Sequence, residues 1–458
     1  YVNDSPIGGS FRFTEVHDSG TDLTGVTGAY PIDLDSDGHM DLAVLRFGEN
    51  ILFRGVGECR FERANEDLHF DGGDTWTAGF SATWEGAAAL PTLAIGSYVE
   101  LDASGRQTGD CSDNLLMRPD ADGYAHPTAL SPGWCTLSLL FSDWDRSGRS
   151  DLRVANDKHY YRDGEEQLWR IEEGEPPHLY TRDEGWKKLQ IWGMGIASHD
   201  VTGDGLPEVF LTSQGDNKFQ ALTDGPTRPS YGDIAIRRGA SAHRPFTGDD
   251  PMPSTGWHPE FQDVNNDGFT DLFITKGNVD AMPEYAAKDP NNLLLGQPDG
   301  TFVESAVAAG IVHYDRSRGA ALVDLNLDGM LDLVEVNRVV NVNLFRNVGF
   351  GDADNPAQMG NWTAIRLEQS GVNPDAIGSW IEVKTGDVVV QNEITIGGGH
   401  AGDQTGWVHF GLGLSNETDI RVQWPNGETG PWMTVAANKF VVITPDSDAP
   451  TVWSPTES

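Results

Sequence analysis

The chain has 458 residues, enough for one large domain and a second, smaller one. Its 70 acidic residues outnumber its 31 basic residues, and the formal net charge of -39 argues against nucleic acid as a partner because phosphates would be repelled. No apolar run reaches the roughly eighteen residues that a membrane-spanning helix needs. With 54 Gly, 25 Pro and many short β-branched or aromatic runs, the composition predicts an all-β fold rich in turns.

The sequence starts at Tyr1 and shows no signal-like segment. We expect a mature secreted or periplasmic protein whose leader has been removed, although a trimmed chain would look the same.

An acidic loop that runs directly into a strand recurs along the chain. DLDSDGHMDLAVL starts at Asp33, DWDRSGRSDLRVA at Asp143, DVTGDGLPEVFLT at Asp200, DVNNDGFTDLFIT at Asp263 and DLNLDGMLDLVEV at Asp324. WEGAAALPTLAIG, from Trp84, keeps the strand without the acidic residues. Further strand-like runs, such as NILFRG and NLLLGQPDGTFVE, follow the loops. Four strands per unit at a steady spacing are typical of β-propeller blades.

These starts define six units over residues 1–350, and a seventh, more degenerate unit stays open. The run FRFTEV, residues 11–16, resembles the last strand of a unit. We expect it to complete the final blade and close the ring, which would hide sheet edges from solvent.

Oxygen-bearing side chains occupy positions 1, 3, 5 and 9 of five loops, the arrangement in which a short loop wraps a hard cation. The predicted metal ligands are Asp33, Asp35, Asp37 and Asp41; Asp143, Asp145, Ser147 and Asp151; Asp200, Thr202, Asp204 and Glu208; Asp263, Asn265, Asp267 and Asp271; and Asp324, Asn326, Asp328 and Asp332. A set made only of oxygen donors suits Ca²⁺ and not a softer metal, so we expect about five structural calcium sites.

A single loop of this kind has two other interpretations, an EF-hand and a simple Asx-turn. An EF-hand needs Glu at its twelfth position and flanking helices, whereas the loop at Asp263 has Ile274 there and leads into a strand-like run. A simple Asx-turn without metal explains one loop, but it does not explain the regular recurrence.

Residues 351–458 differ from the repeats. From residue 361 the segments TAIRLE, WIEVKT, VVVQNEITI, WVHFGL and DIRVQW alternate between apolar and polar residues, with Gly- and Pro-containing turns between them. This pattern predicts a small antiparallel β-sandwich as a second domain.

The repeat DxDxDGxxDL followed by a strand resembles the FG-GAP or VCBS-type repeat of integrin α-subunit propellers. The segments NWTAIRLEQSGVNPDAIGSWIEVKTG, GGGHAGDQTGWVHFGLG and VQWPNGETGPW resemble the ASPIC/UnbV domain. Together they are similar to the cartilage acidic protein-like family over nearly the whole chain. The resemblance implies a secreted calcium-binding propeller associated with extracellular matrix or adhesion, and it implies no known reaction.

Residues just before the innermost strand of each unit are expected to ring the channel mouth, opposite the acidic loops. Trp192, Trp257, His258 and Arg318 are the candidate ligand-binding residues there, with His199 and His243 near by in sequence. Tryptophan, histidine and arginine suit a sugar or an anionic group. The competing interpretation is that the tryptophans pack between blades and that His258 is a satisfied buried residue.

Two function classes remain open. The first is a calcium-stabilised protein that binds an extracellular glycan or protein. The second is a secreted enzyme that acts on a polysaccharide or another anionic substrate at the channel mouth. No nucleophile or metalloprotease motif supports a particular reaction, and no catalytic residue is identified.

The three cysteines allow one disulfide and one free thiol. In the expected blades Cys111 and Cys135 both lie on the channel-mouth face, whereas Cys59 lies on the acidic-loop face. We therefore predict a Cys111–Cys135 bridge and a free Cys59.

Overall fold

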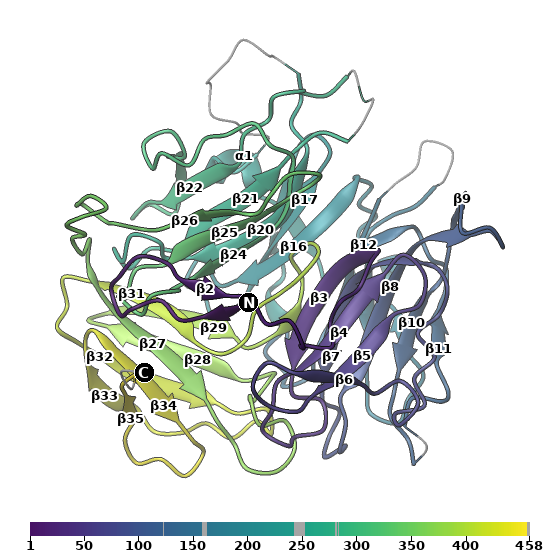
Figure 1. Ribbon diagram of the computed structural model, residues 1–458, viewed down its shortest axis with the longest axis horizontal. Coiled ribbons are helices and arrows are strands. Elements are labelled where there is room, and N and C mark those ends of the chain that lie inside the picture. Colours follow the sequence, from purple (N-terminus) through teal and green to yellow (C-terminus); the bar gives the residue numbers. More distant parts are fainter. Residues whose placement is uncertain (122, 158–162, 242–251, 280–281, 283, 456–458) are drawn as a thin grey trace.

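A computed structural model describes residues 1–121, 123–157, 163–241, 252–279, 282 and 284–455. These residues form an all-β protein, as predicted, with a propeller and a β-sandwich beside it (Figure 1). Within the described ranges, helix is limited to α1 (Ala235–Arg238) and two 3-10 turns, Arg182–Glu184 and Gly225–Thr227. No helix in the described part of the chain is long and apolar enough to cross a membrane.

In the described part of the chain, six blade-like groups of antiparallel strands follow one another, and the second and third of them belong to one sheet. The first three contain β3 (Val26–Ile32), β4 (Asp41–Arg46), β5 (Ile51–Gly55) and β6 (Phe61–Arg63); β7 (Trp76–Thr83), β8 (Thr92–Leu101), β9 (Gln107–Cys111), β10 (Asn114–Met117) and β11 (Thr128–Leu130); and β12 (Thr136–Ser142), β13 (Asp151–Asn156), β14 (Gln167–Arg170) and β15 (His178–Leu179). The others contain β16 (Gly193–His199), β17 (Glu208–Ser213), β18 (Lys218–Leu222) and β19 (Tyr231–Asp233); β20 (Gly256–Gln262), β21 (Asp271–Lys276), β22 (Asn292–Gly296) and β23 (Phe302–Glu304); and β24 (Ser317–Val323), β25 (Asp332–Asn337) and β26 (Asn343–Phe345).

The innermost strand of every blade has a register shift near its start, for example between Val26 and Gly28 and between Ser317 and Gly319. The same irregularity occurs in β7, β12, β16 and β20. Glycine is needed where neighbouring inner strands approach closely. A Cβ atom on Gly195 of β16 would overlap the carbonyl oxygen of Trp257 in β20. Close packing of the strands around the axis therefore depends on these small residues.

The sixth blade has three described strands, because the N-terminal run does not complete it. β2 (Phe13–Thr14) pairs with β1 (Val2–Asn3) in a separate hairpin, so the expectation for residues 11–16 was wrong. The N-terminal segment instead hydrogen-bonds to the acidic loop of the sixth blade, which starts at Asp324. The amide of Gly8 donates to the Asn326 carbonyl over 2.8 Å, and the Asn326 side chain donates to the Gly9 carbonyl over 3.0 Å. The resemblance of residues 11–16 to the last strand of a unit therefore did not predict their pairing, which is with β1.

The C-terminal domain is a sandwich of two four-stranded sheets. One sheet has the order β31 (Val408–Gly413), β27 (Asn361–Leu367), β34 (Lys439–Ile443) and β35 (Thr451–Trp453), and the other has the order β29 (Val388–Glu393), β28 (Trp380–Thr385), β32 (Glu417–Gln423) and β33 (Met433–Ala436). Ile365 and Phe410 from one sheet and Ile381 and Ile420 from the other share one buried core. The predicted sandwich is thus present, but it is not wholly antiparallel, because β27 pairs with β34 in parallel.

A glycine-rich segment of the sandwich threads the axis of the propeller. Its first part, β30 (Ile396–Gly397), hydrogen-bonds between β7 and β12 and so joins the second and third blades into one sheet. The following residues contact the third, fourth and fifth blades in turn: the amide of Gly398 donates to Leu139, that of Gly399 to Ile196, and that of His400 to the Nδ1 atom of His258 over 3.0 Å. Ala401 then lies against Gly319 of the sixth blade. Gly402 forms a bridge to Ala29 of the first blade. The axial segment, residues 396–402, therefore contacts the innermost strand of every blade.

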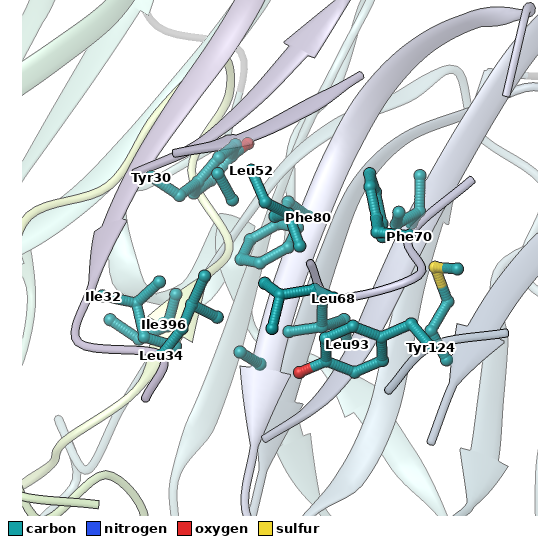
Figure 2. Close-up of a cluster of buried hydrophobic side chains, with 14 of the residues drawn as sticks. Tyr30, Ile32, Leu34, Leu52, Leu68, Phe70, Phe80, Leu93, Tyr124 and Ile396 are labelled. Atoms are coloured by element: carbon teal, nitrogen blue, oxygen red, sulfur yellow. The ribbon is translucent and has the colours of Figure 1, made fainter. Parts of the chain in front are cut away.

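Apolar residues of the sandwich also enter the propeller core. Ile396 packs against Ile32 and Leu34 in the cluster that joins the first two blades (Figure 2), and Ile377 belongs to the same cluster. At about 25 cal/mol per Å² of buried apolar surface, two buried isoleucines contribute several kcal/mol to holding the two domains together.

The cysteines are arranged as predicted. Cys111 and Cys135 form a disulfide, which ties the edge strand β9 of the second blade to the start of β12 in the third. Cys59 is free and exposed in the turn between β5 and β6, close to the first acidic loop.

We predict that Gly397→Ala destabilises the protein by about 2–5 kcal/mol. Gly397 has a φ of 119°, and an added Cβ atom would lie 2.6 Å from the carbonyl oxygen of Phe80. The measurement is urea unfolding in calcium-containing buffer. Gly386→Ala is the matched control, because Gly386 has a φ of 62° with no atom within 4 Å of the added Cβ. Equal losses in the two variants would show that the axial segment is not tightly constrained.

Candidate metal centre

Each of the five acidic loops connects the innermost strand of a blade to its second strand. The first carboxylate folds back over its own loop: in the first loop Asp33 accepts the amides of Asp37 over 3.2 Å and Gly38 over 3.0 Å. Asp143, Asp200, Asp263 and Asp324 accept the equivalent pair of amides in their own loops. These hydrogen bonds close the loop around its side-chain oxygens.

The fourth position of each loop has a left-handed backbone. Its occupants are Ser36, Arg146, Gly203, Asn266 and Leu327, with φ angles between 57° and 71°. The side chain at this position therefore points out of the loop, which leaves the side chains at positions 1, 3 and 5 free to converge.

The ninth-position carboxylate anchors the loop to the blade. Asp41 accepts the amides of Leu34 over 2.8 Å and of Gly55, at the end of β5, over 2.7 Å. Asp271 and Asp332 make the same two bonds in the fifth and sixth blades. A carboxylate held by two buried amides is positioned before any ligand arrives, which lowers the entropic cost of binding one.

The donor geometry of the first loop fits a cation with oxygen ligands, and no other acidic loop in the described part of the chain brings three carboxylate oxygens as close together. Carboxylate oxygens of Asp33, Asp35 and Asp37 lie within 4.8 Å of one another. Asp35 Oδ1 in the first loop, and Asn326 Oδ1 and Asp328 Oδ2 in the sixth, are buried without a hydrogen-bond partner in the described part of the chain. Buried acceptors without a donor are costly, and a bound cation would satisfy them.

The raised pKa values of the loop carboxyl groups also favour a bound cation. Burial, with a smaller contribution from neighbouring carboxylates, raises the pKa of Asp263 and of Asp332 to about 7 and that of Asp41 to about 6. The pKa of Glu208 in the fourth loop is raised to about 7 for the same reasons. A divalent cation would stabilise the ionised forms that these loops otherwise disfavour.

Two units depart from the pattern. In the third loop Asp151 already accepts from Arg149 over 3.0 Å, from Trp144 over 2.8 Å and from Tyr180 over 2.9 Å, so an internal cation neutralises the ninth position. In the second unit, which lacks the motif, Glu85 pairs with Arg118 over 2.8 Å. An arginine thus takes the role of countercharge in both of these units.

All five acidic loops contact the C-terminal part of the chain. Ser36 accepts the Asn373 amide, Arg146 donates to Gln423 over 2.8 Å, Asp200 accepts from Gln391 over 3.3 Å, Asn266 pairs with His409 over 2.6 Å, and Gly329 lies against the ring of Trp362. No local pattern in the sequence indicates these contacts, because every one of these pairs spans more than thirty residues. The candidate metal loops therefore form the propeller side of the interdomain interface.

The channel-mouth residues are only partly brought together. Trp257 is 7% exposed, its indole donates to the Gly277 carbonyl over 2.8 Å, and it shares a cluster with Trp192. The Arg318 guanidinium stacks on Trp257 at 3.9 Å. Burial, together with the charges of Arg338 and Arg316, lowers the pKa of Arg318 to about 9.

The histidines do not join that group at an open mouth. His258 is 5% exposed and faces inward, where it contacts the axial segment and Glu260 at 3.5 Å. His199 lies at the other end of its blade, between Asn392 and Thr270, and burial lowers its pKa to about 4. His243 lies outside the described residues.

Three half-buried carboxyl groups of the C-terminal domain, Asp375, Glu393 and Asp403, were missed by the sequence reasoning. Burial raises the pKa of Asp403 to about 7, that of Glu393 to about 8, and that of Asp375 by a smaller amount. Asp403 accepts the amides of Gly397 over 2.6 Å and Gln404 over 2.8 Å, so it fixes the axial segment. The glycine triplet at residues 397–399 was the only sequence signal for this region, since three adjacent glycines indicate close backbone approach.

Two family models match parts of this chain. The FG-GAP-like repeat matches residues 263–335, which contain the acidic loops of the fifth and sixth blades. ASPIC and UnbV matches residues 369–450, which cover most of the sandwich and the axial segment. No curated protein matches the chain.

Several solved structures are similar in part. A lectin of Agrocybe aegerita, described as recognising non-reducing terminal N-acetylglucosamine, is 15% identical with a TM-score of 0.39, over 71% of this chain and 82% of the lectin. A mutant of the GH43 protein BlXynB from Bacillus licheniformis is 10% identical with a TM-score of 0.31, over 92% and 90% of the two chains. The Tc holotoxin pore of Photorhabdus luminescens is 13% identical with a TM-score of 0.28, over 61% of this chain and 12% of that one. Scores this low support no conclusion about function.

We predict that Arg146→Ala loosens the sandwich from the propeller. Arg146 stacks on Trp380 at 4.0 Å, donates to Gln423 and pairs with Glu382 at 3.4 Å, so its removal should lower the free energy of unfolding by about 2–3 kcal/mol. Arg60→Ala is the control, because the Arg60–Glu58 pair is exposed and should cost less than about 1 kcal/mol. Equal stability of both variants by urea unfolding would contradict a structural role for Arg146.

Asp403 should make stability depend on pH. Its folded pKa of about 7 lies above the ordinary value of 3.8, so its contribution is fully present below about pH 4 and is lost as the pH rises through 7. Between pH 5 and pH 8 in saturating calcium, the wild type should lose about 2–4 kcal/mol more unfolding free energy than Asp403→Asn. The exposed Asp387→Asn should keep the wild-type slope. A slope unchanged in Asp403→Asn would rule out this role.

Proposed function

Because this chain combines FG-GAP-like repeats with a C-terminal ASPIC and UnbV domain, as the cartilage acidic protein-like family does, we propose that it is a secreted or periplasmic calcium-binding protein that binds an extracellular glycan or protein. Calcium holds the C-terminal sandwich on the propeller, and the two domains act as one binding unit.

The observation that carries this proposal is the position of the five acidic loops against the sandwich. Without a cation, each loop brings several carboxylates to a buried interface, where burial disfavours their charge. Calcium held by the ligands at positions 1, 3, 5 and 9 would supply positive charge there and fix the loop that the sandwich contacts. Binding of calcium and docking of the sandwich therefore support one another.

The acidic loop at Asp143 should bind calcium more weakly than the other four acidic loops. Its ninth-position carboxylate is already paired with Arg149, and a cation would have to compete with that guanidinium. The other four loops place no arginine on their ninth-position carboxylate in the described part of the chain. The proposal is thus about five sites, four of them stronger than the one at Asp143.

The alternative of an enzyme at the channel mouth has less support. His258 hydrogen-bonds to the axial segment and lines a cavity between the propeller and the sandwich instead of the channel mouth, and Trp257 is packed and hydrogen-bonded. The axis itself is filled by residues 396–402.

Elemental analysis of the purified chain should find about four to six Ca²⁺ per molecule, and chelation should lower the melting temperature. A site at ten times its dissociation constant adds about 1.4 kcal/mol, so four or five sites add about 6–7 kcal/mol. Asp37→Asn and Asp328→Asn should each reduce the calcium content, whereas the exposed Asp67→Asn should not. A calcium-free protein with unchanged stability would contradict the proposal.

Binding itself needs a separate measurement. The intact protein is applied to arrays of extracellular glycans and matrix proteins, with calcium or with chelator. The proposal expects retention that is lost on chelation, because the composite surface needs the docked sandwich. Retention that is equal with and without calcium would separate ligand binding from the metal sites.

A further inference from the structure

A cavity of about 160 Å³ lies beside the axial segment, between the propeller and the sandwich. One wall comes from β16 and β20 of the fourth and fifth blades, and the other from residues 366–377 and 392–408 of the sandwich. It is partly open to solvent and lined by polar and apolar surface in similar amounts. None of the predicted metal ligands belongs to its lining.

The wall offers hydrogen-bond acceptors on several sides. Glu260 comes from β20, Asp403 from the axial loop and Asp375 from the sandwich. The Gln404 side chain donates to Glu260 over 2.7 Å, which fixes one of these carboxylates in place. The carboxylate of Asp375 makes no hydrogen bond or ion pair with another described residue, so it can accept from a ligand.

The wall also holds two donors without acceptors. The hydroxyl of Ser198 and the Nε atom of Arg366 are buried, and neither has a hydrogen-bond partner in the described ranges. Each unpaired donor costs free energy unless something in the cavity accepts its hydrogen. The site thus offers both donors and acceptors around one small space, which is the complement of a ligand with several hydroxyl groups.

A metal ion fits this cavity poorly. Calcium needs six to eight oxygens at about 2.3–2.6 Å, so its ligands must converge. Among the described residues, the cavity contributes no group of three carboxylate or histidine ligand atoms within 4.8 Å of one another, whereas the first acidic loop does. Acceptors spread around a space that would hold about five water molecules suit a larger polar ligand.

We infer that this cavity binds a single uncharged sugar ring, whose hydroxyl groups accept from Ser198 and Arg366 and donate to Asp375 and Glu260. Glu260, Asp375, Glu393 and Asp403 outnumber Arg366 in the wall, so an acidic sugar of the same size should bind more weakly than a neutral one. Leu140, Ile196 and Trp407 supply the apolar part of the wall against which the C–H faces of a sugar can pack. This inference rests on the proposed binding function and names its ligand class.

The test uses the full-length protein in saturating calcium and saturation-transfer NMR with D-glucose, D-galactose, D-mannose and N-acetyl-D-glucosamine. At least one of these probes should bind with a dissociation constant on the order of 1–10 mM, as expected for a ligand of this size. D-glucuronate, which has the same ring and a carboxylate, should bind at least tenfold more weakly. Failure of all four neutral sugars, or stronger binding of glucuronate, would overturn the inference.

Two variants locate the binding site. Ser198→Ala should weaken sugar binding about three- to tenfold, and Asp375→Asn at least as much, without loss of stability, because neither side chain hydrogen-bonds to another described residue. Ser138→Ala is the matched control: Ser138 is also a buried serine with an unpartnered hydroxyl, but it lies outside the cavity. Equal affinity in Ser198→Ala and wild type would place any sugar site elsewhere.

The test of the sugar site and the tests of the proposed function can fail independently of one another. Four or five calcium ions per chain and calcium-dependent retention of a matrix protein, with no neutral sugar bound, would uphold the binding unit and reject this cavity as its ligand site.

Discussion

The fold depends on one segment, residues 396–402, that passes through the centre of the propeller. Its main-chain groups hydrogen-bond to the second, third, fourth and fifth blades, it bridges to Ala29 of the first, and it lies against Gly319 of the sixth. A propeller closed only by side-chain packing would leave polar main-chain groups of its inner strands exposed to the channel. Here the sandwich supplies their partners, so neither domain has its complete set of hydrogen bonds alone.

The same arrangement explains the distribution of charge. A net charge of -39 opposes compact folding, and the greatest local density of carboxylates lies in the loops beneath the sandwich. Arginine provides countercharge in the third and second units, where Arg149 pairs with Asp151 and Arg118 with Glu85. It does so in the first loop as well, where Arg54 donates to Asp35 over 2.6 Å.

The interdomain cavity is a consequence of how the axial segment leaves the propeller. After Gly402 the chain turns away through Asp403 and Gln404, which keep their side chains bonded at the propeller axis while β31 begins the next strand of the sandwich. The space between them cannot be filled by an apolar core, because its wall carries carboxylates from both domains. It is therefore polar, and it forms only when the domains are docked.

The sequence by itself determined the local units, because each is encoded within a dozen residues: the acidic loops and their strands, the alternation of the sandwich strands, and the blade faces that predicted the Cys111–Cys135 bridge. Tertiary structure alone decided which face the sandwich covers, the hairpin of β1 and β2, the parallel pairing of β27 with β34, and the inward turn of His258 toward His400. Those features join residues ten or more positions apart, and 142 positions separate His258 from His400. A pattern of neighbouring residues cannot predict such contacts, because the hydrogen bonds and the burial that stabilise them exist only once both domains have folded.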